Sequence, residues 1–156
     1  MTFSKATAWA AASLFCLSAL PVLGQEDAAG GKLVLQLNNA KTLPAASADG
    51  QPTCQLIFAI RNDTGADTPK TTFNMAIIDS NQQATGLVGF EFKPLRNGET
   101  KFQQFGLQGQ SCEDLTGVLV NEIVECGSDG AAGNPVCSAE IAESSRTSIQ
   151  FPWELQ

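Results

Sequence analysis

Histidine and tyrosine are both absent from the 156 residues of this chain. The first absence removes the most frequent general base and metal ligand, and the second removes a frequent proton donor. Positive charge is also scarce, because 9 Lys and Arg stand against 16 Asp and Glu, which gives a formal net charge of −7. So few basic residues cannot neutralise a phosphate backbone, and we therefore expect no binding of nucleic acid.

Long apolar runs are missing from the chain after residue 24. The one apolar stretch covers residues 6–20, which is short for a membrane span but typical of the apolar region of a secretory signal peptide. We predict cleavage near Gly24, so that the product starts at Gln25. A lipid anchor at Cys16 is the alternative, but Phe15 precedes it, where a lipoprotein signal needs a small residue. The predicted product is a periplasmic or secreted protein that does not span a membrane.

The remaining chain is long enough for a single core. We predict a signal peptide over residues 1–24, a flexible N-terminal segment over residues 25–31, and one β-sandwich domain over residues 32–156. Because Lys5 leaves with the signal peptide, 8 positive and 16 negative residues remain, a balance of −8.

Apolar residues alternate with polar ones in seven short segments, as expected for strands. In residues 53–61, Leu56, Phe58 and Ile60 share one face while Ile57 and Ala59 share the other, which indicates a central strand. The predicted strands cover residues 32–38, 53–61, 71–79, 85–92, 100–105, 116–125 and 147–153. This pattern predicts an all-β fold, an antiparallel immunoglobulin-like β-sandwich of about seven strands. The domain is not of the antibody type, because its third strand has no Trp and its sixth no Tyr.

Four cysteines remain after cleavage, an even number that favours two disulfides in an exported domain. A zinc site is the alternative, but there is no His, and no C-x-x-C pair occurs. In a sandwich of seven alternating strands, Cys54 begins the second strand and Cys112 precedes the sixth, so both lie at one end. Cys126 ends the sixth strand at the other end, within reach of Cys137. We therefore predict the pairs Cys54–Cys112 and Cys126–Cys137.

Two stretches resemble known exported proteins. Residues 54–65, CQLIFAIRNDTG, look like the second strand and turn of small immunoglobulin-like domains. Residues 104–107, Cys112, residues 117–121 and Cys126 are similar to a group of uncharacterised exported bacterial proteins with such a domain. The resemblance covers about residues 33–137 and consists of framework positions. It implies fold and export, and transfers no catalytic residue.

Candidate catalytic and metal sites are weak. Glu122 and Glu125 are three residues apart in a predicted strand, so they should point to opposite faces and not form the facing pair of a glycosidase. The oxygen-rich turns at residues 62–67 and 129–134 lack the spacing of an EF-hand, and the turn chemistry of Asn and Asp explains them. Asn121 lies among apolar residues and is predicted to be a buried amide. With no base beside any Ser or Thr, we predict no enzyme, no cofactor and no metal.

Aromatic residues offer the remaining candidate site. Phe90, Phe92, Phe102 and Phe105 come from neighbouring predicted strands and form a possible binding surface, although a sandwich core explains them too. Phe105 breaks the alternation set by Phe102, so its exposure is the point to examine. The predicted function is an exported interaction or structural module that binds a protein partner in the cell envelope or the secreted fraction. The alternative is a β-sandwich that binds a small ligand or a carbohydrate.

Overall fold

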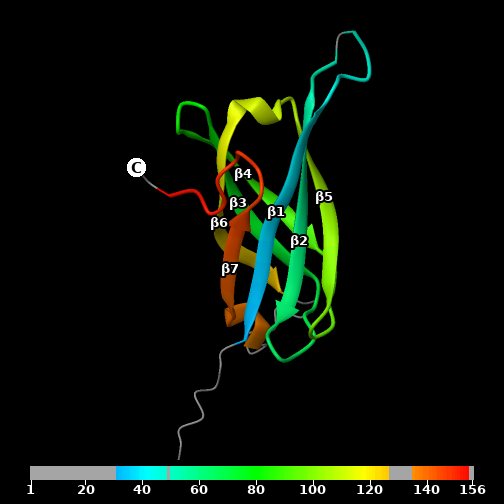
Figure 1. Ribbon diagram of the computed structural model, residues 1–156, viewed down its shortest axis with the longest axis vertical. Helices are drawn as coiled ribbons and strands as arrows, with labels where there is room; N and C mark the ends of the chain where they lie inside the picture. Colours follow the sequence, from blue (N-terminus) through cyan, green and yellow to red (C-terminus); the bar gives the residue numbers. More distant parts are fainter. Residues whose placement is uncertain (1–30, 49, 127–134, 155–156) are drawn as a thin grey trace, which may run out of the picture.

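The computed structural model describes residues 31–48, 50–126 and 135–154. The described residues form seven strands and two short 3-10 turns (Figure 1). The strands are β1 (Lys32–Leu43), β2 (Thr53–Asp63), β3 (Thr71–Asp79), β4 (Ala84–Phe92), β5 (Thr100–Gln108), β6 (Leu115–Cys126) and β7 (Glu140–Ser145). The turns are η1 (Cys112–Asp114) and η2 (Pro135–Ser138). The predicted signal peptide lies outside the described residues, and it stays a prediction.

The strands form two sheets. One has four strands in the order β5-β2-β1-β7, and the other has three in the order β4-β3-β6. Neighbours pair antiparallel, with one exception: β1 and β7 run parallel. The prediction of an all-β fold with seven strands is therefore confirmed, but the described part of the fold is not purely antiparallel.

The seventh strand is not where the sequence predicts it. Residues 140–145 form β7, whereas the C-terminal segment at residues 147–153 makes only an isolated parallel bridge, between Gln150 and Gly117 of β6. In Figure 1 this segment passes beside β6. Ile149 and Phe151 are buried in the core. The predicted alternation is therefore present, but it places these two side chains between the sheets and does not form a strand.

The core lies between the two sheets and is built from alternate residues of each strand. Phe58 of β2 is completely buried at its centre. Its ring meets those of Phe90 and Phe92 of β4, Phe105 of β5 and Phe151 edge-on, with centroids 5.5–6.1 Å apart. Edge-to-face contacts of this kind add to the gain from burial. The same layer holds Leu33, Leu35, Leu37, Leu56, Ile60, Phe73, Met75 and Ile77.

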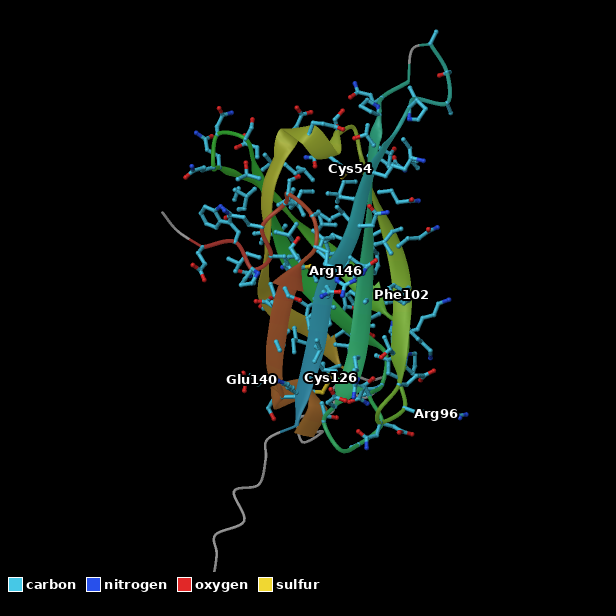
Figure 2. The ribbon with its side chains drawn as sticks, in the orientation of Figure 1. Cys54, Arg96, Phe102, Cys126, Glu140 and Arg146 are labelled. Carbon is cyan, nitrogen blue, oxygen red and sulfur yellow. A yellow bond between two sulfur atoms is a disulfide. The ribbon has the colours of Figure 1, made fainter. Side chains whose placement is uncertain are left out.

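Both predicted disulfides are present, with the predicted connectivity. Cys54 and Cys112 have Cα atoms 4.7 Å apart, and Cys126 and Cys137 have Cα atoms 5.7 Å apart. Figure 2 shows Cys54 and Cys126 toward opposite ends of the sandwich, as the strand directions require. Two disulfides indicate an oxidising, exported environment for the folded chain.

Candidate interaction surface

The four phenylalanines of the predicted binding surface do not lie together on the surface. Phe90 and Phe92 are buried, and the Phe105 ring packs against both, with centroids 4.8 and 5.1 Å away. Phe102 alone is exposed, at 64%, on the outer face of β5. Figure 2 shows it at the margin of the molecule. The proposed surface was therefore mostly core, because residues 90 and 92 share the inward face of β4 with Val88.

A two-sheet sandwich has four outermost strands, here β4, β5, β6 and β7, and their edges decide which surfaces are open to a partner. The strands meet in two facing pairs, β6 with β7 and β4 with β5.

The side between β6 and β7 is closed by the C-terminal segment. The N–H of Gln150 donates to Thr116 O, and the N–H of Val118 donates to Gln150 O, both at 2.9 Å. Trp153 then donates its N–H to Val118 O, and its side chain covers Gly117. A Cβ at position 117 would come 2.7 Å from the Trp153 Cβ and Cγ, so this packing requires glycine. These contacts satisfy the edge of β6 over residues 116–118.

Glu143 closes the next part of the β6 edge. It stands opposite Leu35 in the β7–β1 register, which directs it toward the interior, and it accepts a hydrogen bond from the Val120 N–H. Burial raises the pKa of the Glu143 carboxyl, while the Val120 bond opposes that shift. Its Oε1 is buried and has no hydrogen-bond partner among the described residues. The Glu143 carboxylate thus accepts the hydrogen bond from β6 that a backbone carbonyl of a neighbouring strand would otherwise accept.

The side between β4 and β5 is closed only around the end of β4. Gln103 of β5 donates to Glu91 O at 3.1 Å and accepts from the Lys93 N–H at 2.8 Å. Lys101 donates to Pro94 O at 2.7 Å. The side chains of β5 therefore bind backbone groups of Glu91, Lys93 and Pro94 that point away from β3.

Over the first half of β4 the two edges separate and leave a cleft of about 310 Å³. Its lining comes from β3, β4, β5 and the loop after β5: Ile77, Thr85, Gly86, Val88, Gly106, Leu107, Gln108 and Gln110. No strand or side chain among the described residues bridges the β4 edge at residues 86–89 by a hydrogen bond. This stretch is an open edge of the sandwich.

The outer face beside this edge is apolar. Ala76 of β3 stands opposite Leu87 of β4 on one side and Leu119 of β6 on the other, so the three form one row across the sheet. Ala76 is buried, Leu119 is half-buried, and Leu87 at the end of the row is 57% exposed. The row therefore ends in an exposed leucine at the edge that carries no neighbouring strand.

The outer face at the opposite end of this sheet is charged. Lys70 lies between two carboxylates, 3.2 Å from Glu91 Oε2 and 3.1 Å from Glu125 Oε2. Its hydrogen bond to Glu125 lowers the pKa of that carboxyl, and the same bonds raise the pKa of Lys70. Glu122 accepts from Asn74, on the same face.

The prediction that Glu122 and Glu125 point to opposite faces is wrong. Their partners in the register, Asn74 and Thr72, share the outer face of β3, because a bulge at Val124 adds one residue to β6. Glu125 is 3.1 Å from the Lys70 Nζ, which lowers the pKa of its carboxyl, whereas the general acid of a glycosidase needs a raised pKa. Asn121 is exposed, not a buried amide as predicted, and a second bulge explains its position.

The oxygen-rich turn after β2 holds the chain in place. Asn62 is buried, donates to Ala66 O and Leu95 O, and accepts from Thr64 N and Oγ1. Asp67 accepts from the Asn97 N–H at 2.9 Å. The turn's oxygens are thus engaged in joining two loops. The second oxygen-rich turn, residues 129–134, lies outside the described residues.

Two further observations apply to the part of the chain that the structure describes. It contains no group of three or more Cys, Asp or Glu side chains placed to hold a metal ion. It also contains no helix with the length and apolar character needed to cross a membrane.

Comparison of the chain with known protein families, with curated proteins and with solved structures finds no match. The functional argument therefore depends on the molecule's own geometry. The β4 edge was not among the sequence-predicted sites. The signals for it were the run ATGLVGF at residues 84–90, which has no charge, and the two glycines within it.

Proposed function

We propose that this chain is an exported, non-catalytic interaction module that binds a protein partner of the cell envelope or the secreted fraction. The partner adds a strand to the free edge of β4, beside the cleft between β4 and β5. Strand addition supplies backbone hydrogen bonds for affinity, and adjacent side-chain pockets supply specificity.

The observation that carries this proposal is the open first half of β4. Natural sheets usually protect an edge with Lys, Pro, a covering segment or inward charges, since a bare edge invites association. The edge of β6 is covered over residues 116–120 by the C-terminal segment and by Glu143, and β5 carries long polar side chains such as Lys101 and Gln103. Residues 84–90 of β4 have no charged or proline residue. A strand edge that is bare in the isolated chain is expected where a bound partner covers it in the complex.

We further propose an immunoglobulin-like type for the sandwich and a cleaved signal peptide over residues 1–24, in line with the exported bacterial proteins that the sequence resembles. The Cys54–Cys112 bond supports the fold type, because it links the start of β2 in one sheet to the turn before β6 in the other. The two disulfides support export.

Site-specific photo-crosslinking tests the proposed function. A photoreactive amino acid replaces Leu87 in one variant and Phe102 in a matched control, since both side chains are highly exposed but lie on different sheets. We expect a covalent protein adduct from position 87 in the envelope or secreted fraction of the producing cell, and none from position 102. Adding Gly89→Lys should abolish the adduct. An adduct from position 102 only, or from neither position, contradicts the proposal.

A further inference from the structure

Neither a positive φ nor a close neighbouring atom requires glycine at the two glycines of β4, Gly86 and Gly89. The other described glycines either have a positive φ or have another atom within 3.2 Å of where a Cβ would lie. At Gly86 nothing lies within 4 Å, and at Gly89 the closest atom is Thr72 Cγ2 at 3.5 Å, an ordinary contact. Glycine weakens a strand interior, and it often marks the close approach of another backbone. No backbone among the described residues makes that approach.

The direction of the backbone groups along β4 follows from Gln103. Its side chain binds Glu91 O and Lys93 N from the side away from β3, so these residues direct their backbone groups to the free edge. Backbone groups of alternate residues in a strand point to the same edge. Leu87 and Gly89 therefore offer their N–H and C=O groups to the free edge, whereas Val88 pairs with Met75 of β3.

We propose that the occupant of this edge is a second copy of the same chain. Two β4 strands pair antiparallel about a twofold axis at Val88, so that Leu87 of each copy lies opposite Gly89 of the other. The proposal rests on the proposed function, whose partner it names.

The geometry of β4 fits this pairing at two levels. Residues that exchange both N–H···O bonds in an antiparallel pair must both face the shared edge, and Leu87 opposite Gly89 satisfies that condition twice around the axis. On the outer face, the absent Cβ of Gly89 leaves space for the exposed Leu87 side chain of the second copy. The apolar row of Leu119, Ala76 and Leu87 would then continue into the second copy's sheet.

Charge selects the same arrangement. After the predicted cleavage each copy has a net charge of −8, so two copies repel in most orientations. Residues 84–90 have no charge, and the antiparallel register places Glu91 opposite Thr85 of the second copy. A parallel, in-register pairing would place the two Glu91 carboxylates side by side, where like charges are destabilising.

The contact is short, because Gln103 already occupies the edge from Glu91 onward. Leu87 and Gly89 of the two copies form four backbone hydrogen bonds across the twofold axis. Beyond these residues and their immediate neighbours, the pairing buries little surface. A standard stable interface buries about 800 Å² on each partner, and this one should bury less. We therefore expect a reversible dimer with a dissociation constant of about 10–100 µM.

Sedimentation velocity on the exported chain, with its disulfides formed, tests the proposal over about 1 µM to 1 mM, a range that brackets the expected constant. The unsubstituted chain should shift from monomer to dimer. Gly89→Lys should weaken the dimer at least tenfold, and its fold should persist because a Cβ fits at that position. Phe102→Lys is the matched control on the other sheet and should dimerise like the unsubstituted chain.

Cysteine pairing then tests the register. Leu87→Cys mixed with Gly89→Cys should form an intermolecular disulfide, because opposed residues have Cα atoms about 5.5 Å apart, within disulfide range. Peptide mapping must show residue 87 joined to residue 89. Leu87→Cys alone should cross-link much less, because its two copies lie diagonally across the pair.

Each outcome decides between the two proposals. A chain that stays monomeric to 1 mM, a dimer that Gly89→Lys leaves intact, or a bond between other residues overturns the second-copy proposal. If the chain is monomeric and position 87 still photo-cross-links to a different protein, the second-copy proposal fails while the proposed function stands. If neither association occurs, both are wrong.

Discussion

The two disulfides should contribute unequally to stability. Replacing Cys54 and Cys112 together by Ala should lower the free energy of unfolding more than replacing Cys126 and Cys137 together. The first bond joins residues 58 apart in sequence, and the second joins residues 11 apart. A crosslink that closes a longer loop removes more conformational entropy from the unfolded chain.

The size of the difference follows from these separations. The chain-entropy relation gives about 4.2 kcal/mol for the longer loop and about 2.8 kcal/mol for the shorter one, and the difference, (3/2)RT ln(58/11), is about 1.5 kcal/mol. Burial acts in the same direction. Cys54 and Cys112 belong to the core, so their loss also leaves a cavity there, whereas Cys126 and Cys137 are half-buried.

Urea unfolding followed by circular dichroism measures the difference. With a denaturant slope typical of a domain of this size, the midpoint of the Cys54/Cys112 variant should lie about 1 M below that of the Cys126/Cys137 variant. The unsubstituted chain, measured oxidised and reduced, gives the two limits. Equal midpoints, or a lower midpoint for the Cys126/Cys137 variant, would refute the loop-length reasoning.

Two further predictions concern the edge of β6. Gly117→Ala should lower the free energy of unfolding by about 2 kcal/mol and shift the tryptophan emission, because its Cβ would overlap the Trp153 side chain, whereas Gly86→Ala, with nothing within 4 Å, should change stability by less than about 0.5 kcal/mol. The pKa of the Glu143 carboxyl is raised in the folded chain above its unfolded value, so the folded state binds this proton more tightly than the unfolded state does. The free energy of unfolding therefore falls as the pH rises from the unfolded pKa of Glu143 through its folded pKa. Glu143→Gln should keep an acceptor for Val120 and should gain stability relative to the unsubstituted chain between pH 4 and pH 7; urea midpoints that stay parallel over this range would contradict the assignment.

Alternation and strand direction were sufficient to predict most of the fold. Residues 53–61 were predicted as a central strand because both faces carry apolar side chains, and β2 indeed has neighbours on both sides. The cysteine pairing followed from strand direction alone, without knowledge of the sheet order. The first inference uses the local periodicity of apolar residues, and the second uses the alternating direction of successive strands. Both can be obtained from the order of residues in the sequence.

The failures have a common physical origin in irregular strands. Residues 140–145 show little apolar alternation because Glu143 occupies an inward position, where it binds a backbone N–H and not the core. The prediction for Glu122 and Glu125 failed because a bulge changes the face of every later residue. Whether Phe102 or Phe105 faces inward depends on which of them shares a register with the inward residues of β2, and that register is not visible in the sequence.

The β4 edge was the part of the surface that sequence reasoning came closest to without recognising. Glycines within a strand, such as Gly86 and Gly89, are typical of a bend or a bulge, and the register does shift next to Gly86, between Ile77 and Ile78. A bulge needs one irregular residue, however, and Gly89 lies in the regular part of the ladder with room for a Cβ atom. Only the structure separates a glycine that the fold requires from one that it merely tolerates.

Because the fold does not require glycine at position 89, the open edge of β4 is not a necessary consequence of folding a small sandwich. A single Lys at position 87 or 89 would protect the edge, and both positions have space for one, since Leu87 is already exposed and a Cβ fits at Gly89. The same chain satisfies the β6 edge over residues 116–118 with a C-terminal segment, and it places Gln103 and Lys101 against Glu91 at the end of β4 and against Lys93 and Pro94 after it. Leu87 and Gly89, which precede these residues, have no such cover among the described residues, and they are the two residues whose backbone groups a pairing strand would bind.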